Sequence, residues 1–261
     1  MMGSYQMTFM RYEKKYLLDD SQYNEFIKKT GGRLVPDDYG TTTICNIYFD
    51  TPDAQLIRAS LDKPVYKEKL RLRSYGKVVK DGPVFLELKK KYQGIVYKRR
   101  ENMVLSEAEG YLLRHEKPGV DTQILREIDW FLQFYKNIAP AMYIAYDRIA
   151  AYDIQEPELR VTFDWNIRFR DQELDLKKGT WGQQILEEGQ QLMEIKIPGA
   201  MPVWLSGILD QLHIYPISFS KYGRAYRMQS EEKGKEDSKK AEMRLLQCIP
   251  DREEKGGRHY A

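Results

Sequence analysis

The stretch KLRLRSYG at residues 69–76 alternates basic and apolar side chains, and this alternation favours a strand over a helix. Successive side chains of a strand point to opposite faces, so Arg71 and Arg73 share one face while Leu70 and Leu72 share the other. The segment VFLELKKK at 84–91 repeats the pattern, with charged residues at 87 and 89 and leucines at 86 and 88. Both segments predict strands with one apolar and one charged face.

Similar runs predict six more strands, and helical periodicity is confined to short segments. The eight predicted strands lie at 9–17, 43–50, 65–75, 83–91, 94–104, 141–152, 158–168 and 191–198. The predicted helices lie at 21–29, 52–61, 106–115, 122–136 and 202–212. This order predicts an α+β fold with a dominant antiparallel sheet. Large apolar residues disappear just after residue 228, so we expect a folded domain at 1–228 and a charged, flexible tail at 229–261.

The charged faces of these strands are mostly basic, although the whole chain is nearly balanced, with 42 Lys+Arg and 39 Asp+Glu. With Lys221 included, the basic residues are Arg11, Lys15, Arg71, Arg73, Lys89, Lys98, Arg100, Arg148, Arg160, Lys196 and Lys221. The acidic residues are Glu13, Glu87, Asp164 and Glu194. Any single strand is explained by a sheet with one solvated face. Together, the excess of basic residues predicts a surface that binds an anion.

The residue types indicate phosphate and a hard metal ion. Arginine presents a planar fork that matches phosphate oxygens, and the few carboxylates suit Mg²⁺ or Mn²⁺. So many like charges cannot converge in a dry core, because an unpaired buried charge costs several kcal/mol. We therefore expect a closed antiparallel β-barrel whose charged interior holds water, metal and ligand, with helices packed on its apolar outside.

Composition excludes several other classes of site. Cys45 and Cys248 match no zinc spacing and suggest no disulfide framework. The three histidines lie far apart in sequence, which argues against a His-rich metal site or a Ser-His-Asp triad. No apolar run approaches the roughly 20 residues that span a bilayer, and the first nine residues lack the apolar core of a signal peptide. The expectation is a cytoplasmic protein that does not bind nucleic acid.

Nine motifs, in order over roughly residues 8–228, resemble the VTC (vacuolar transporter chaperone) domain of the triphosphate tunnel metalloenzymes, which are relatives of the CYTH proteins. They are RYEKKY (11–16), YFDT (48–51), KLRLRSYG (69–76), VFLELKKK (84–91), YKRR (97–100), YDRIAAY (146–152), LRVTFD (159–164), MEIK (193–196) and SFSKYGRAY (218–226). The resemblance implies an eight-stranded tunnel that binds a triphosphate or polyphosphate. It also implies a metal-dependent polymerase that transfers the γ-phosphoryl group of ATP to a polyphosphate chain.

The resemblance also implies roles for individual residues of this chain. The implied catalytic residues are Arg71, Arg73, Arg148 and Lys221. The implied substrate-binding residues are Lys15, Lys89, Lys98, Tyr146, Arg160, Lys196 and Ser220. The implied metal ligand is Glu194, with help from Glu13 or Glu87.

Two departures from the family pattern leave alternatives open. The sequence lacks the membrane segments and the inositol-phosphate-sensing domain of the eukaryotic versions, so coupling to transport would require a membrane-protein partner. The first motif reads Arg-x-Glu-x-Lys (Arg11, Glu13, Lys15) where the CYTH branch has Glu-x-Glu-x-Lys. This argues for fewer metal ligands and against a two-metal hydrolase. An inorganic triphosphatase that uses the same tunnel, and a module that only binds polyphosphate or nucleotides, remain alternatives.

Overall fold

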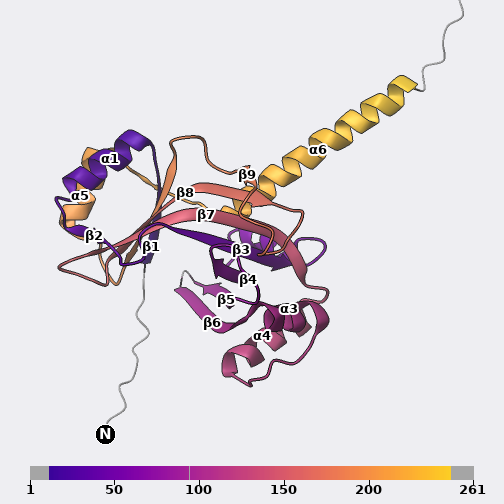
Figure 1. Ribbon diagram of the computed structural model, residues 1–261. Coiled ribbons are helices and arrows are strands. Elements are labelled where there is room, and N and C mark those ends of the chain that lie inside the picture. The colour runs from indigo at the N-terminus through magenta and orange to yellow at the C-terminus, as the bar shows by residue number, and fades with distance from the viewer. Residues whose placement is uncertain (1–11, 94, 248–261) are drawn as a thin grey trace, which may run out of the picture. The chain divides into compact units, whose positions relative to one another are not determined.

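The computed structural model of the protein describes residues 12–93 and 95–247 (Figure 1). The strands are β1 (Tyr12–Leu18), β2 (Leu34–Pro36), β3 (Thr42–Asp50), β4 (Tyr66–Tyr75), β5 (Pro83–Tyr92), β6 (Ile95–Val104), β7 (Ala139–Asp153), β8 (Arg160–Arg170), β9 (Gln183–Gln184), β10 (Gln191–Ile197) and β11 (Pro216–Ile217). The helices are α1 (Asp20–Lys29), α2 (Gln55–Leu61), α3 (Leu105–Arg114), α4 (Gln123–Phe134), α5 (Val203–Gln211) and α6 (Lys221–Gln247). The eight predicted strands and five predicted helices are all present. The sequence analysis missed β2, β9 and β11, which have only two or three residues each.

The strands form one antiparallel sheet, and the expected closed eight-stranded barrel is wrong. The sheet has eleven strands, and its main path runs β11-β1-β10-β8-β7-β3-β4-β5-β6, with β2 on β7 and β9 on β8. Within the described residues, no backbone ladder joins β6 to the other end of this path. On its side away from β10, β1 pairs with the two-residue strand β11 and with no other strand of the described residues. Alternation in sequence identifies faces but not which strand edges pair, so it could not reveal this opening.

The sheet nevertheless curves strongly. Strands β1 and β5 are six steps apart along the path, which would separate them by about 29 Å in a flat sheet. Yet Lys89 Nζ on β5 lies 4.0 Å from Glu13 Oε2 on β1. One face of the sheet is therefore concave, and charged side chains cross its opening. This arrangement is consistent with a tunnel fold, and we call the concave side the inner face.

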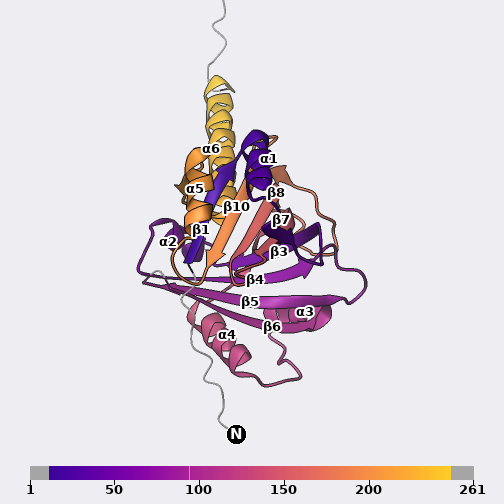
Figure 2. The same cartoon turned by 90° about the vertical axis from the view of Figure 1, so that its left-hand side faces the viewer.

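Two separate groups of helices lie against the outer face of the sheet, α1 with α5 and α3 with α4 (Figure 2). Apolar side chains of the sheet pack beneath each group. One cluster joins leucines of β4 and β5 to Tyr111 of α3 and Phe131 of α4. The other joins β1, β8 and β10 to Phe26 of α1 and Leu205 of α5. Each fully buried leucine stabilises the fold by about 1.5–3 kcal/mol. The helices thus hold the sheet from outside and leave its inner face to polar groups.

Local signals explain where three helices begin. Asp19 and Gln22 form a capping box at the start of α1, and the Thr122 hydroxyl caps α4. Asp50 ends β3 and accepts hydrogen bonds from the backbone N–H groups of Leu56 (2.8 Å) and Ile57 (3.0 Å) in α2. Asp50 therefore caps the start of this helix, although it lies five residues before it.

The chain forms two compact units, Met1–Ala225 and Tyr226–Ala261. Helix α6 begins at Lys221 in the first unit and continues to Gln247 in the second. It therefore includes the first part of the segment that the sequence analysis assigned to a charged tail. Opposite charges four residues apart, as at Glu231 and Lys235, favour such a helix. No helix in the described part of the chain is long and apolar enough to cross a membrane.

Candidate anion-binding site

Strand register places charged side chains directly beside one another on the inner face. Lys69 of β4 lies opposite Lys89 of β5, which lies opposite Lys98 of β6. In the next row, Arg71 lies opposite Glu87, which lies opposite Arg100. The charged faces that alternation predicted for 69–76 and 84–91 thus lie side by side and continue onto β6.

Four cations surround the buried carboxylate of Glu87, and we call this group the Glu87 centre. Arg71 Nη2 lies 2.7 Å from Oε2 and Lys98 Nζ lies 2.8 Å from Oε1. Arg100 Nε donates to Oε1 at 2.8 Å, and Arg73 Nε lies 3.8 Å from Oε2. Burial would raise the pKa of Glu87, but the cations, Arg71 foremost, outweigh burial and hold the pKa far below its ordinary value. One negative charge therefore faces four positive ones.

A second group, the Glu194 centre, contains two carboxylates and three cations. Glu194 Oε1 lies 3.1 Å from Lys15 Nζ and 3.4 Å from Lys221 Nζ. Asp164 accepts hydrogen bonds from Arg148 Nη2 (2.7 Å) and Lys221 Nζ (2.5 Å). Asp164 is therefore held as an ion-pair partner of Arg148 and Lys221. Burial would raise the pKa of Glu194, but Lys221, Lys15 and Arg148 hold it well below its ordinary value.

Tyr146 connects the two centres. Its hydroxyl lies 3.4 Å from Arg73 Nη2, while Lys221 Nζ lies 4.4 Å from the centroid of its ring. Burial would raise the pKa of this phenol, but Arg73, Arg148 and Lys221 outweigh burial and lower the pKa to about 8. The phenol therefore lies in a strongly positive field.

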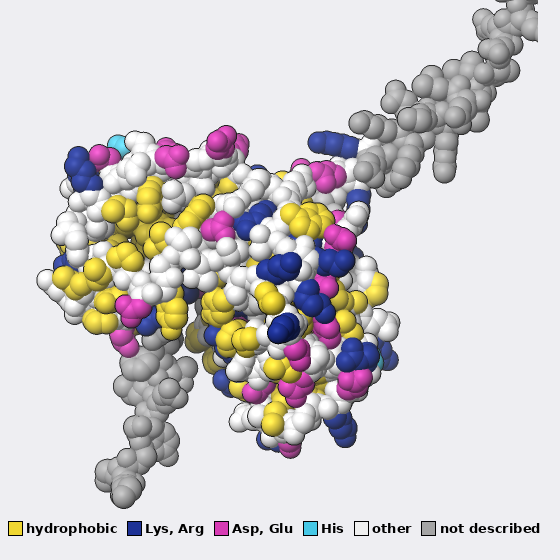
Figure 3. All heavy atoms as spheres, viewed as in Figure 1, with side chains coloured by type: hydrophobic (Ala, Val, Ile, Leu, Met, Phe, Trp, Pro, Cys, Tyr) yellow, Lys and Arg dark blue, Asp and Glu magenta, His cyan; other side chains and the backbone are white. Residues whose placement is uncertain are grey.

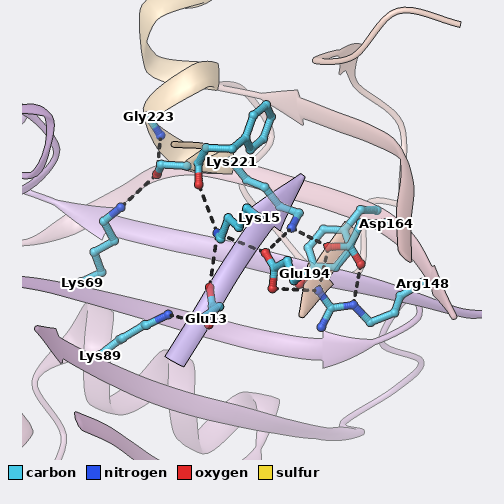
Figure 4. A network of polar contacts seen from close by, with 12 residues as sticks. Glu13, Lys15, Lys69, Lys89, Arg148, Asp164, Glu194, Lys221 and Gly223 are labelled. Atoms are coloured by element: carbon cyan, nitrogen blue, oxygen red, sulfur yellow. Dashed lines mark hydrogen bonds and ion pairs between the residues drawn. The ribbon is translucent and has the colours of Figure 1, made fainter. Parts of the chain in front are cut away.

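Side chains from the two ends of the sheet path meet across the opening (Figure 4). Glu13 lies between Lys15 (3.5 Å) and Lys89 (4.0 Å). Lys69 donates to Ser220 Oγ at 3.1 Å, just before α6, and Lys15 donates to the carbonyl of Phe219 at 3.1 Å. Strands β1, β4 and β5 and the start of α6 therefore surround one space.

The inner face carries far more positive than negative charge. Nine cations lie in or between the two centres: Lys15, Lys69, Arg71, Arg73, Lys89, Lys98, Arg100, Arg148 and Lys221. Four carboxylates accompany them: Glu13, Glu87, Asp164 and Glu194. In contrast, Lys and Arg on the face of the molecule drawn in Figure 3 are interspersed with Asp and Glu. The bias towards anions is thus a property of the inner face.

The carboxylates of this face differ in how well they suit a metal ion. No three His, Cys, Asp or Glu side chains in the described part of the chain are grouped as a metal site. Glu13 and Glu194 both contact Lys15, at 3.5 and 3.1 Å. One or two carboxylates suffice for Mg²⁺ when substrate phosphates supply further oxygens. This pair therefore fits a divalent ion bound together with phosphate. Glu87 fits less well, because Arg71, Lys98 and Arg100 all lie within 2.8 Å of its two oxygens, whereas the cations around Glu194 lie at 3.1 Å or more.

The structure brings most of the predicted site residues together. Of the fourteen residues assigned from the family resemblance, two lie at the edge of the group. Arg160 is exposed at the first position of β8, directly opposite Lys196 of β10, and no hydrogen bond or ion pair is described for either. Lys196 is half-buried and lowers the pKa of Glu13 and Glu194 electrostatically. Arg11 of the first motif lies outside the described residues.

Sequence reasoning missed four polar residues of the inner face. Lys67 and Lys69 are four and two positions before Arg71 on the same strand, so alternation could have identified them. Tyr48 of β3 accepts a hydrogen bond from Arg71 Nη1 at 3.0 Å. Its ring stacks on Tyr222 at 4.7 Å between centroids, and the Tyr222 hydroxyl donates to Asp50 at 2.9 Å. No short-range signal links Tyr222 to Asp50, because 172 positions separate them.

Comparisons with known proteins were made for the whole chain. The family model described as the VTC domain matches residues 10–229. No curated protein matches the chain. The solved structures with a similar fold include the following two. One, from Bacillus halodurans, is provisionally described as an adenylate cyclase (TM-score 0.51, 15% identity, covering 81% of this chain and 95% of that chain). The other, from Hippeastrum, is provisionally described as an adenylyl cyclase with a dominant triphosphatase activity (TM-score 0.50, 16% identity, covering 83% and 96%).

Proposed function

Because this chain belongs to the VTC domain family, we propose that it acts on phosphoanhydride bonds within its curved sheet. The proposed reaction transfers the γ-phosphoryl group of ATP to the end of an inorganic polyphosphate chain and releases ADP. One observation carries the proposal: nine cations face four carboxylates on a concave surface built from both ends of the sheet. A multiply charged anion would relieve the remaining repulsion, and a phosphate chain has the required charge.

The proposed roles follow from how each side chain is held. Phosphoryl transfer depends mainly on positioning and on neutralising charge. Arg71 holds its fork on Glu87, whereas Arg73 donates to Asn46 Oδ1 (3.0 Å) and to the Tyr146 hydroxyl (3.4 Å). From these positions both guanidinium groups could contact phosphate oxygens two at a time. Lys221 and Arg148 would stabilise charge on the transferring group from the other side. The terminal phosphate of the acceptor is already ionised, so no protein group needs to remove a proton from it.

The Glu13–Glu194 pair is our proposed position for Mg²⁺ or Mn²⁺. A divalent ion bound there supplies a Lewis acid that neutralises charge on phosphate oxygens. Lys15 contacts both carboxylates and would move aside or remain as a second neutralising charge. Lys89, Lys98, Tyr146 and Ser220 would contact the remaining phosphates.

The proposal is tested by incubating the protein with ATP and Mn²⁺ and separating the products on a gel. We expect a ladder of phosphate chains and an equivalent amount of ADP. Glu194→Gln is the matched variant, and it should lose the ladder at every metal concentration. Release of orthophosphate alone would disprove the polymerase reaction.

A hydrolase is the second candidate, because one solved structure with the same fold is described as having triphosphatase activity. In that reaction water would replace the terminal phosphate of the acceptor chain. Tripolyphosphate as sole substrate distinguishes the two candidates. A hydrolase converts it to pyrophosphate and orthophosphate in equal amounts, whereas a polymerase without ATP should leave it largely intact.

A further inference from the structure

The hydroxyl of Thr162 is a buried polar group for which the described residues provide no partner. Thr162 is 6% exposed, and its Oγ1 forms no hydrogen bond with any described residue. An unpaired buried hydroxyl is unfavourable, because the group loses its bonds to water and gains none in return. Valine has nearly the same shape and also favours strands, so the strand itself does not require a hydroxyl at this position.

Strand register places Thr162 inside the Glu194 centre. Thr162 lies on β8 directly opposite Glu194 of β10. It is two positions before Asp164, so the two side chains share the inner face. Residues directly opposite in an antiparallel pair have Cβ atoms about 4.5–5.5 Å apart. The Thr162 hydroxyl is therefore a close neighbour of the Glu194 carboxylate.

The neighbour of Thr162 on the other side is small and uncharged. There Thr162 lies opposite Ala150 of β7, which is half-buried. Arg148, two positions before Ala150, forms an ion pair with Asp164. A methyl group, and not a cation, thus lies beside the hydroxyl on this side.

The two oxygens of Glu194 differ in how closely cations approach them. Oε1 lies 3.1 Å from Lys15 Nζ and 3.4 Å from Lys221 Nζ. The cation described at Oε2 is Arg148 Nη2, at 3.8 Å, which is too far for a hydrogen bond. Oε2 therefore keeps lone pairs with which it can bind a further ligand.

A carboxylate oxygen beside a neutral hydroxyl suits Mg²⁺ or Mn²⁺. These hard cations take oxygen ligands, and Mg²⁺ commonly combines one or two carboxylates with phosphate oxygens and water. A serine or threonine hydroxyl and an aspartate hold Mg²⁺ against a triphosphate in P-loop enzymes, so this pairing of ligands is chemically sound. Binding to such an ion would give the Thr162 hydroxyl the partner that the fold does not supply.

We propose that the Thr162 hydroxyl is a further ligand of the divalent cation beside Glu194, either directly or through a water molecule bound to the ion. This inference rests on the proposed function in taking Glu194 as a metal ligand. It assigns β8 a part in the metal site, in addition to β1 and β10. The hydroxyl stays unpaired until the ion binds, so the empty protein is less stable than it would be with valine at this position.

The test is calorimetric titration of the whole chain with tripolyphosphate, once with Mn²⁺ and once with a chelator in place of the metal. In Thr162→Val, the affinity in Mn²⁺ should fall about tenfold, while the affinity in chelator should change less than about twofold. Thr162→Ser keeps the hydroxyl and should keep the parent's affinity in Mn²⁺. Unchanged affinity of Thr162→Val in Mn²⁺ would overturn the proposal. So would equal losses with and without the metal, because they would show a phosphate contact or a general defect.

Urea unfolding of the empty protein gives a second readout that does not depend on activity. Thr162→Val should raise the urea midpoint, because valine removes the unpaired hydroxyl. Thr30→Val is the matched control, since Thr30 is also 6% exposed but its hydroxyl donates to the carbonyl of Ile27 at 2.7 Å. The control should lower the midpoint and leave both affinities unchanged. A lower midpoint in Thr162→Val would show that its hydroxyl already has a partner in the empty protein, and would overturn the proposal.

Glu194→Gln and the gel ladder separate this inference from the proposed function. Like Thr162→Val, Glu194→Gln should lower the ratio of the affinity in Mn²⁺ to the affinity in chelator. A lower ratio in both variants without a ladder would disprove the polymerase and keep the role of Thr162. An unchanged ratio in Glu194→Gln would remove the ion from Glu194 and overturn the inference.

Discussion

Glu87→Gln should destabilise the empty protein and strengthen its response to a phosphate ligand. The carboxylate is buried and balances Arg71, Arg73, Lys98 and Arg100 within 3.8 Å. Removing one partner of a buried ion pair costs about 3–5 kcal/mol. Several of these cations remain partly exposed, with Lys98 41% and Arg100 34% accessible, so solvent screening reduces the expected loss to about 2–4 kcal/mol.

The assay is urea unfolding at pH 7.5, with and without tripolyphosphate. The anion replaces the missing negative charge, so it should raise the free energy of unfolding of Glu87→Gln more than that of the parent. Glu127→Gln is the matched control, because it breaks a partly exposed pair in which Arg99 Nε and Glu127 Oε2 lie 3.2 Å apart. That control should lose less than about 1 kcal/mol.

The effect also has a defined pH dependence. The folded-state pKa of Glu87 lies below its unfolded value, so its contribution to stability is fully present above the unfolded pKa and disappears as pH falls through the folded pKa. The difference between parent and variant should therefore be constant from pH 5.5 to 8 and shrink only in strong acid. A loss below about 1 kcal/mol at pH 7.5, or an equal response to tripolyphosphate, would refute the balancing role of Glu87.

Three further outcomes are expected. Arg73→Ala should lower turnover, measured as ADP release, by about 100-fold or more and keep a cooperative unfolding transition. Arg73→Lys should restore only part of the rate, because lysine lacks the planar fork. Full activity in the alanine variant would remove Arg73 from the site. When tripolyphosphate binds at pH 8, the protein should take up a proton at Lys69, because the pKa of Lys69, about 7 in the empty protein, rises beside an anion. Calorimetry in buffers of different ionisation enthalpy measures this proton uptake. The same uptake in Lys69→Met would contradict the assignment. Charged Lys69 should also destabilise the empty fold most below pH 7, with this penalty vanishing towards pH 10.5, so the stability advantage of Lys69→Met should shrink over the same range. Asp50→Ala removes the acceptor of four hydrogen bonds, from the backbone N–H groups of Thr51, Leu56 and Ile57 and from the Tyr222 hydroxyl, and should lower the free energy of unfolding by about 2–3 kcal/mol in urea. A loss under about 1 kcal/mol would show that the cap and the Tyr222 contact contribute little.

Alternation along single strands predicted much of this fold and site. The pattern around Arg71 and Glu87 identified two neighbouring strands and the charged face that they share. Because the face of a residue depends only on its position along the strand, even a short motif fixes it. The same rule would have identified Lys69, which the sequence analysis passed over because it examined only the arginines of that strand.

Closure and long-range contacts could not be predicted in this way. Whether a sheet closes depends on the pairing of edge strands, and the short strand β11 on β1 left no signal in the sequence. The hydrogen bond between Tyr222 and Asp50 depends on the path of the whole chain. Arg160 has the expected face, yet its place at the start of β8 leaves it exposed. The face on which a side chain lies is determined locally, whereas the meeting of side chains from distant strands depends on the complete fold.

Calorimetric titration with tripolyphosphate tests most directly whether both ends of the sheet bind one anion. Arg71→Met alters β4 and Lys15→Met alters β1, and each variant should weaken a single site of one ion per chain by about tenfold or more. Two independent ions per chain, or unchanged affinity in either variant, would contradict the account.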